Sequence, residues 1–466
     1  MRATAARQVS SAIPYFIGPN HGPSARRSAI ASTEQPSTPP EPETHSDAYS
    51  RYVLGLLTVA YVFNYLDRQI LAVLLEPIKK DLGVSDTAMG FLTGTAFALF
   101  YATAGIPVAR LADRWVRRNV LVIGLVVWSG MTAACGAVGN FWQLALCRVG
   151  VGVGEAGGVP PSHSLISDYF RPHRRATAFG IFAVGPLIGS AIGNGLGGWL
   201  AGEVGWRSTF VIIGMPGIVL ALIVFFTLRE PQRGRFDPPE VRDTTGPQPD
   251  TREVFRYLWS RRTFRLLAPA IGLATFAGLG FGMWAPAFLM RVHGMSVTET
   301  GLFLGTVSAP AGALGALFGG WAADRLGRRD MRWYAWLPAI TLLAALPFQA
   351  VQLLADTRWI ALAAFVPAAL IGGVFAPPTY AIVQNLAAPR MRALASATLL
   401  LFINLIGLGC GPQFVGILND LMAPSFGDTA IRYSLLMIKV ATAAAALLYW
   451  LAARSIQADT EAGLGR

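Results

Sequence analysis

Residues 320–329 read GWAADRLGRR, and residues 111–118 read LADRWVRR. Both stretches contain the pattern Asp-Arg-x-x-Arg-Arg, and each follows a long apolar run. The first copy follows the second apolar run of the first half of the chain, and the second copy follows the second run of the second half. One charged motif at the same place in two series of apolar runs indicates that a helical unit was duplicated.

The apolar runs around these loops are each about 20 residues or longer, the length that an α-helix needs to cross a bilayer. They lie at about residues 52–75, 87–110, 119–138, 141–166, 176–201, 207–228, 263–290, 297–323, 333–354, 358–386, 393–419 and 431–453. With 53% of its residues hydrophobic and 14% charged, the chain must place most of its surface against lipid. We therefore predict an all-α integral membrane protein, with twelve transmembrane helices in two six-helix bundles related by pseudo-two-fold symmetry.

The polar stretches predict the boundaries of these bundles. A Ser- and Pro-rich start predicts a disordered tail, and a second polar, Arg- and Pro-rich stretch predicts a disordered linker between the halves. The expected division is a tail at 1–50, a first bundle at 51–228, a linker at 229–262, a second bundle at 263–455 and a tail at 456–466.

The formal charge of +12 is concentrated in alternate loops. The Arg-rich loops and linker hold Arg110, Arg114, Arg117, Arg118, Arg171, Arg174, Arg175, Arg229, Arg233, Arg235, Arg325, Arg328, Arg329 and Arg392, among others. Because basic loops stay in the cytoplasm, we expect these loops, the linker and both termini to be cytoplasmic. The surplus charge is thus a topology signal, and it argues against a nucleic-acid partner. The three cysteines lack the spacing of a metal site.

The repeated loop resembles the signature of the major facilitator superfamily, Gly-x-x-x-Asp-Arg-x-Gly-Arg-Arg. The second copy matches it fully, whereas Ala109 and Val116 replace the glycines of the first copy. Within the superfamily, residues 64–68 (NYLDR) and 148–155 (RVGVGVGE) resemble the spinster-like branch. The resemblance implies the major facilitator fold, with the first, fourth, seventh and tenth helices lining a central cavity. It also implies transport of lysophospholipids or sphingosine phosphate, coupled to protons.

The loop motif itself predicts a cytoplasmic latch between the halves. An Asp at a helix end can accept charge-assisted hydrogen bonds from Arg or from the amides of a helix N-terminus. Such bonds can form in one conformation and break in another. The latch residues are Asp113, Arg114, Arg117, Asp324, Arg325 and Arg328. The alternative interpretation is an Arg-rich topology anchor that contains an incidental Asp.

Ionisable residues inside apolar runs are costly and therefore mark functional sites. Asp67 and Arg68 lie in the first run, and Arg148 and Glu155 lie in the fourth. The topology places Asp67 and Arg148 at similar depth, with Glu155 about two turns deeper. We predict Asp67 and Glu155 as proton-coupling carboxylates, because desolvation favours their protonated form.

Arg68 and Arg148, with Asn64 and Tyr65, are predicted to form ion pairs or to bind an anionic substrate. A static network of buried ion pairs is the alternative. Lys439 in the last run is interpreted as a snorkelling residue.

The second half supplies aromatic and amide side chains where the first supplies charge. On the helix assignment that the resemblance implies, the cavity wall is formed by Phe276, Phe281, Trp284, Tyr380 and Gln384. A cavity with one ionic side and one apolar side suits an amphiphile. Lipid-facing or packing roles are the alternative for these aromatic residues.

Together these features predict a proton-coupled secondary active transporter that works by alternating access and exports an amphiphilic or lysolipid-like anion. A proton-coupled symporter of organic anions and a broad drug exporter are the alternatives. No polar domain carries clustered catalytic residues, so we do not expect an enzyme. We expect no cofactor beyond the proton gradient, and a monomer in the bacterial inner membrane, with protons, membrane lipid and the substrate as its partners.

Overall fold

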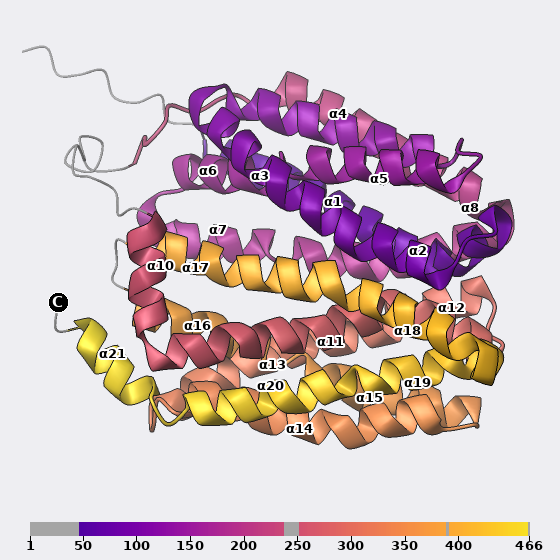
Figure 1. Ribbon diagram of the computed structural model, residues 1–466. Helices are drawn as coiled ribbons and strands as arrows, with labels where there is room; N and C mark the ends of the chain where they lie inside the picture. Colours follow the sequence, from indigo (N-terminus) through magenta and orange to yellow (C-terminus); the bar gives the residue numbers. More distant parts are fainter. Residues whose placement is uncertain (1–45, 237–250, 388–390, 465–466) are drawn as a thin grey trace, which may run out of the picture. The chain divides into compact units, whose positions relative to one another are not determined.

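The computed structural model describes residues 46–236, 251–387 and 391–464, and every regular element in these ranges is a helix. Most helices run alongside one another (Figure 1). Nearly all of the expected tail at 1–50 lies outside the described residues, as do 237–250 of the expected linker.

The first half begins with a long helix and continues through several interrupted ones. Its elements are α1 (Asp47–Leu82), α2 (Asp86–Gly90), the π-helical η1 (Phe91–Ala96), α3 (Phe97–Arg114), α4 (Arg117–Cys135), α5 (Phe141–Glu155), α6 (Val159–Tyr169), α7 (Pro172–Phe182) and α8 (Gly185–Thr227). Within α8 the backbone of Gly205 is not helical (φ 75°, ψ 164°), so α8 contains two successive spans. Such a positive φ favours glycine.

The second half repeats this pattern. It contains α10 (Thr251–Ser260), α11 (Arg262–His293), α12 (Val297–Phe303), η2 (Leu304–Ser308), α13 (Ala309–Gly327), α14 (Trp333–Leu354), α15 (Arg358–Gly372), α16 (Ala376–Leu386), α17 (Arg392–Phe402), η4 (Ile403–Cys410), α18 (Gly411–Phe426), the short 3₁₀ turn η5 (Gly427–Thr429), α19 (Ala430–Met437), α20 (Lys439–Ala452) and α21 (Ile456–Leu464).

Seven helical stretches of the described chain are long and apolar enough to cross a membrane by length and composition. Two of them, Pro172–Thr227 and Leu394–Ala452, each cover two of the spans expected from the sequence. The remaining expected spans, such as α1 with its paired charges, are more polar or are interrupted. Joined end to end, the elements give the twelve-helix arrangement that the apolar runs predict.

Glycines allow helices of the two halves to approach closely. A Cβ atom on Gly301 of α12 would lie 2.4 Å from the carbonyl oxygen of Asn194 on α8 and 2.7 Å from the Cα atom of Gly198. Any side chain larger than hydrogen would therefore push α8 and α12 apart. Small residues at such positions are typical of membrane helix interfaces.

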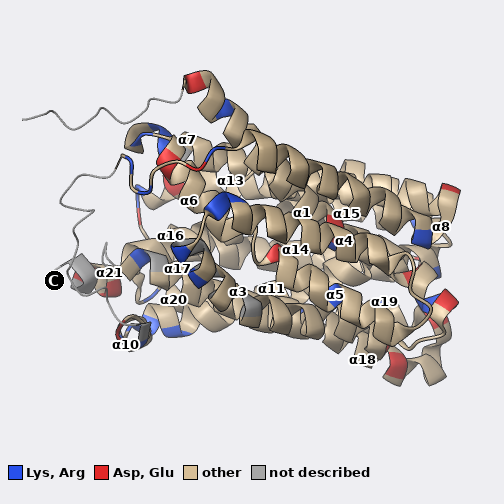
Figure 2. Ribbon diagram, turned by 90° about the horizontal axis from the view of Figure 1, so that it is seen from above, with Lys and Arg blue, Asp and Glu red and all other residues tan. Residues whose placement is uncertain are grey.

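Most of the buried apolar residues that the structure describes belong to one large core that both halves share or to two large cores that they do not. The shared core includes Ile70 and Phe210 of the first half together with Trp284 and Phe288 of the second. The other two large cores each draw on one half alone. The halves are therefore packed together at one end and have separate cores at the other. The end with separate cores is the one that carries the Arg-rich loops (Figure 2).

The structure corrects one prediction about the linker. Residues 229–262 were expected to be disordered, but Thr251–Ser260 form the helix α10. Val254 and Leu258 are fully buried against the core of the second half, whereas Phe255 and Trp259 are exposed. Val254 and Leu258 are four residues apart and so lie on one helix face, which gives this short helix a packing partner.

Candidate functional site

Asp67 and Arg148 form a buried ion pair within the first half. Arg148 Nη1 on α5 lies 3.3 Å from Asp67 Oδ1 on α1, and each residue is 3% exposed. Thr132 on α4 donates a hydrogen bond of 2.5 Å to the other carboxylate oxygen, Oδ2. Three helices therefore meet at the carboxylate of Asp67. Sequence reasoning placed Asp67 and Arg148 at similar depth. It missed Thr132, because the apolar run 119–138 contains no charged residue that would mark a site.

Arg68 and Glu155 form the second ion pair, in which Glu155 is buried and the Arg68 side chain is 18% exposed. Arg68 Nε donates a hydrogen bond of 2.7 Å to Glu155 Oε2, and Glu155 is completely buried. The guanidinium of Arg68 also lies 5.0–5.1 Å from the ring centres of Tyr65, Phe97 and Tyr101. Cation–π contacts of this kind stabilise a guanidinium away from water. Sequence reasoning did not predict that these three rings surround Arg68, because two of them come from α3.

The four residues of these two pairs balance one another's charges, but the cluster is not fully hydrogen-bonded. Two carboxylates face two guanidinium groups. Glu155 Oε1, Arg148 Nε and both polar side-chain atoms of Asn64 are buried without a hydrogen-bond partner. Buried polar groups are normally satisfied, so unsatisfied ones at a charged cluster mark a place where protons or polar ligands can bind.

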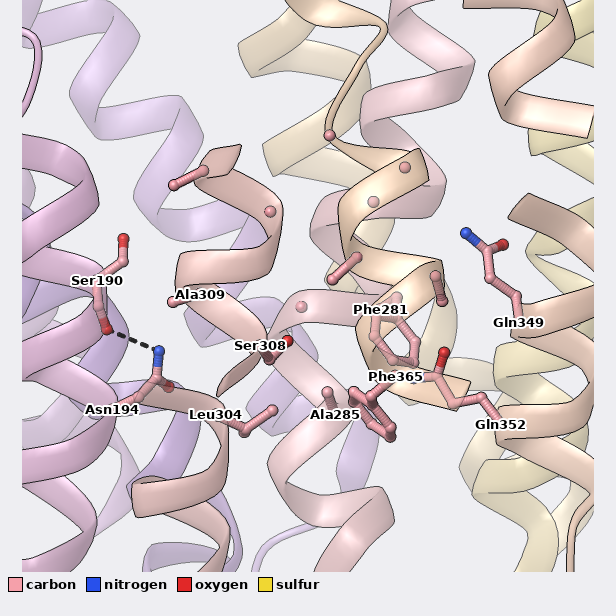
Figure 3. Close-up of a pocket in the computed structure, with 18 of the residues that line it drawn as sticks. Ser190, Asn194, Phe281, Ala285, Leu304, Ser308, Ala309, Gln349, Gln352 and Phe365 are labelled. Atoms are coloured by element: carbon pink, nitrogen blue, oxygen red, sulfur yellow. Dashed lines mark hydrogen bonds between the residues drawn. The ribbon is translucent and has the colours of Figure 1, made fainter. Parts of the chain in front are cut away.

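A cavity of about 410 Å³ is lined mainly by helices of the second half and also by residues of α1 and α8 of the first half (Figure 3). Phe281, one of the predicted wall residues, lines it together with Phe365. The other predicted wall residues do not line this cavity, and their role in a central cavity stays a prediction. Trp284 is fully buried in the core, and its Nε1 donates a hydrogen bond of 2.9 Å to the carbonyl oxygen of Pro412.

Three further wall residues make packing contacts and do not line this cavity. Phe276 packs against Phe414 with ring centres 5.4 Å apart. Gln384 donates a hydrogen bond of 2.5 Å to Ser396. Tyr380 is partly buried against the core of the second half. Of the predicted wall residues, Trp284 fits the alternative role of core packing best, because it is fully buried and its indole N–H donates to a backbone carbonyl.

Lys439 corrects a second interpretation. It was read as a snorkelling residue, yet it is 8% exposed and lines the same cavity as Phe281. Its Nζ lies 4.4 Å from the centre of the Phe281 ring. Residues Lys439, Thr442 and Ala446 of α20 are all buried, so Lys439 lies on the inward face of this helix. A single charge in a run cannot show from sequence which face it occupies.

The latch residues whose side chains the structure describes make their contacts within one half in this conformation. Arg117 is buried and pairs with Asp168 and, at 2.7 Å, with Glu230, so it fixes contacts within the first half and the start of the linker. Asp324 accepts a hydrogen bond of 3.1 Å from Tyr334 within the second half.

The remaining latch residues add no bond between the halves among the described contacts. Arg325 lies 5.9 Å from the ring centre of Trp321, Arg114 lies on a shallow groove and Arg328 is exposed. The side chain of Asp113 lies outside the described residues.

The opposite end, by contrast, is joined by ion pairs between the halves. Arg291 on α11 lies 2.5 Å from Asp86 and 2.6 Å from Glu76, and both acids belong to the first half. Asp420 on α18 accepts hydrogen bonds of 3.1 and 2.7 Å from the backbone amides of Asp86 and Thr87 at the start of α2. Sequence reasoning missed this cluster, because Glu76, Asp86 and Arg291 lie just outside the apolar runs, where a charged residue is not unusual.

The comparisons agree with this geometry. Residues 57–412 match the Major Facilitator Superfamily. The chain resembles the crystal structure of a bacterial homologue of the human lysosomal transporter spinster, in an inward-facing and unoccupied conformation (TM-score 0.82, 33% identity, 89% of this chain and 99% of that chain).

Two proteins known by sequence are also similar. An MFS-type efflux pump of Mycolicibacterium smegmatis is 35% identical, over 90% of this chain and 96% of the relative. The sphingosine-1-phosphate transporter SPNS2 of Danio rerio is 25% identical, over 81% of this chain and 77% of the relative. The protein therefore belongs to the Major Facilitator Superfamily, in its spinster-like branch, and is an integral-membrane transporter rather than an enzyme.

Proposed function

We propose that this protein is a proton-coupled secondary active transporter that exports an amphiphilic or lysolipid-like anion by alternating access. The observation that carries this proposal is the presence of two ion pairs with buried carboxylates, Asp67–Arg148 and Arg68–Glu155, within one half of the molecule. Either carboxylate can take up a proton, and its arginine then loses a neutralising partner. Breaking one side of a buried pair is worth several kcal/mol, about 3–5 kcal/mol in typical cases. Such an energy is large enough to change which conformation is stable.

Helix α1 can transmit this change. It carries Asp67 and Arg68 at the ion pairs and Glu76 at the contacts with Arg291 between the halves. Residues 68 and 76 lie about 12 Å apart along one helix axis, at ~1.5 Å per residue. A displacement of α1 after protonation would therefore reach the closed end directly. In this scheme the protonated carboxylates and the ion pairs that join the two halves are connected by the same helix, α1.

The positive-inside rule assigns the Arg-rich end to the cytoplasm. The halves have separate cores at that end and are joined by ion pairs at the other. On this assignment the conformation is inward-facing, like that of the similar bacterial structure. The amphiphilic substrate is suggested by the name of the relative that transports sphingosine-1-phosphate and by the mixed polar and apolar lining of the cavity.

Flux measurements in proteoliposomes test this proposal. We expect Asp67→Asn and Glu155→Gln each to abolish uphill, pH-driven transport of sphingosine-1-phosphate or a lysophospholipid, while downhill exchange continues, because both variants fix the neutral state. Asp428→Asn is the matched control. It alters an exposed carboxylate in η5 that belongs to neither ion pair, and this variant should transport normally. If both neutral variants transport uphill at the wild-type rate, the pairs are structural and the proposed coupling is wrong.

A broad drug exporter is the second candidate, because one similar protein is described as an efflux pump. Competition experiments separate the two functions. Cationic and neutral drugs would displace a labelled anionic amphiphile from a broad exporter but not from a transporter that selects anions. A proton symporter for organic anions would instead move its substrate in the same direction as the proton, which the sign of the imposed gradient reveals.

A further inference from the structure

Lys439 is a buried cation without a visible counter-charge. Among the described residues, no carboxylate lies within ion-pair distance of its Nζ, and its nearest charge-stabilising contact is the ring of Phe281. Arg68 and Arg148 of the first half differ, since each faces a carboxylate. An ammonium group that is isolated from water is costly unless it is paired. The surroundings of Lys439 therefore favour the binding of an anion.

The cavity beside Lys439 contains the other groups that such an anion needs. Gln352 is 1% exposed, and its Nε2, a donor, has no hydrogen-bond partner; the unpaired atom of Gln349 is Oε1, an acceptor, which does not bind an anionic oxygen. Both glutamines line the cavity. Lysine and an amide N–H are donors, so together they match the oxygens of a carboxylate or a phosphate.

The remaining lining suits an apolar chain. Phe281 and Phe365 lie on the cavity with small residues that leave room between the helices (Figure 3). The small residues are Gly278, Gly282, Ala285, Ala309, Gly312 and Gly372. The volume of about 410 Å³ falls in the usual range of small-molecule sites, about 300–1,000 Å³. One cationic group in a lining that joins polar side chains to these apolar ones matches an ion with a single charged head and an apolar tail.

We propose that this cavity is a binding subsite for the anionic head group of a single-chain amphiphile, with Lys439 as its counter-charge and Gln352 as a hydrogen-bond donor. This assignment rests on the proposed function and refines it. The substrate's charge is neutralised in the second half, so Arg68 and Arg148 keep their own carboxylates. Protons and substrate therefore bind to different groups.

The position of the cavity gives binding a mechanical consequence. Ser190 and Asn194 of α8 line it from the first half, and Gln352 and Lys439 line it from the second. An occupant would contact both halves beside the close packing of α8 on α12. The affinity for this occupant would therefore differ between conformations in which these helices are apart and conformations in which they are packed. Such a difference in affinity is what couples a ligand to a conformational change.

Equilibrium binding to the purified full-length protein in lipid nanodiscs tests this assignment, with radiolabelled dodecyl phosphate as the probe. We expect Lys439→Gln to weaken binding about tenfold or more, since it removes a charge-assisted hydrogen bond. Lys439→Arg should retain most of the affinity. Lys80→Gln is the matched control, because Lys80 is a largely exposed lysine (74%) on α1, and its affinity should be unchanged.

Competitors define the occupant further. Unlabelled dodecyl phosphate should displace the probe, whereas inorganic phosphate and dodecanol should each compete weakly, because each has only half of the recognised structure. If inorganic phosphate competes as well as dodecyl phosphate, the subsite does not select an amphiphile and the proposal is wrong. If Lys439→Gln does not fold, Gln352→Leu serves in its place and should also weaken binding.

The binding assay applies no pH gradient, so its outcome is separable from that of the flux assay. Wild-type affinity in a folded Lys439→Gln variant, together with normal pH-driven flux, would overturn the subsite and leave the transport proposal intact. Loss of proton coupling in Asp67→Asn, with dodecyl phosphate still bound through Lys439, would support both.

Discussion

Arg291 is the residue whose removal should most clearly shift the conformational equilibrium. It is the single guanidinium that contacts both Asp86 and Glu76 across the two halves, at 2.5 and 2.6 Å, and its side chain is 8% exposed. The substitution Arg291→Met keeps much of the side-chain volume and removes the charge. Both acids then lose their partner from the second half. We expect the closed end to open more often.

The magnitude follows from the local charges. Removing one member of a buried ion pair typically costs about 3–5 kcal/mol. Lys79 remains 2.5 Å from Asp86, and the exposed Lys80 remains 3.5 Å from Glu76, so the acids are not left entirely unpaired. We therefore expect the substitution to destabilise the closed conformation by the lower limit of this range, about 3 kcal/mol. At about 1.4 kcal/mol per factor of ten, the ratio of closed to open molecules should fall about 100-fold.

Distances between spin labels provide the measurement. Labels on Glu203→Cys and Ser425→Cys lie on exposed residues of the two halves at the joined end, in a background without the native cysteines. Arg291→Met should add a population at longer distance. Arg207→Met is the matched control, because Arg207 pairs with Asp81 within the first half. An unchanged distance distribution in Arg291→Met would refute the role of this ion pair in holding the end closed.

Two further predictions concern topology and the core. Cysteines placed at Ser46 and Ser425 should react with a membrane-impermeant reagent from opposite sides of the membrane, and labelling of both from outside would contradict the assigned orientation. Trp284→Phe should lower stability by about 1–3 kcal/mol, because it leaves the carbonyl of Pro412 without its donor. Thermal unfolding in detergent measures this loss. Weakened substrate binding with unchanged stability would instead place Trp284 on the cavity wall.

The sequence by itself determined the membrane architecture. Lipid forces every spanning segment to be a helix about 20 residues long, so apolar runs can be counted without knowledge of their contacts. The repeated loop at residues 111–118 and 320–329 then revealed the duplication. Asp67, Arg68, Arg148 and Glu155 could also be identified as candidates, because a charge within an apolar run is costly wherever its helix packs.

The tertiary structure alone decided how these residues are paired. The choice of Arg148 for Asp67 and of Arg68 for Glu155 depends on the rotation of α1 against α5. The inward position of Lys439 likewise depends on which face α20 turns toward α11. Rotations of this kind are set by side-chain packing between distant segments, and a pattern within one helix does not record them. For this reason the sequence predicted where the charges lie along the helices, and only the fold showed which of them meet.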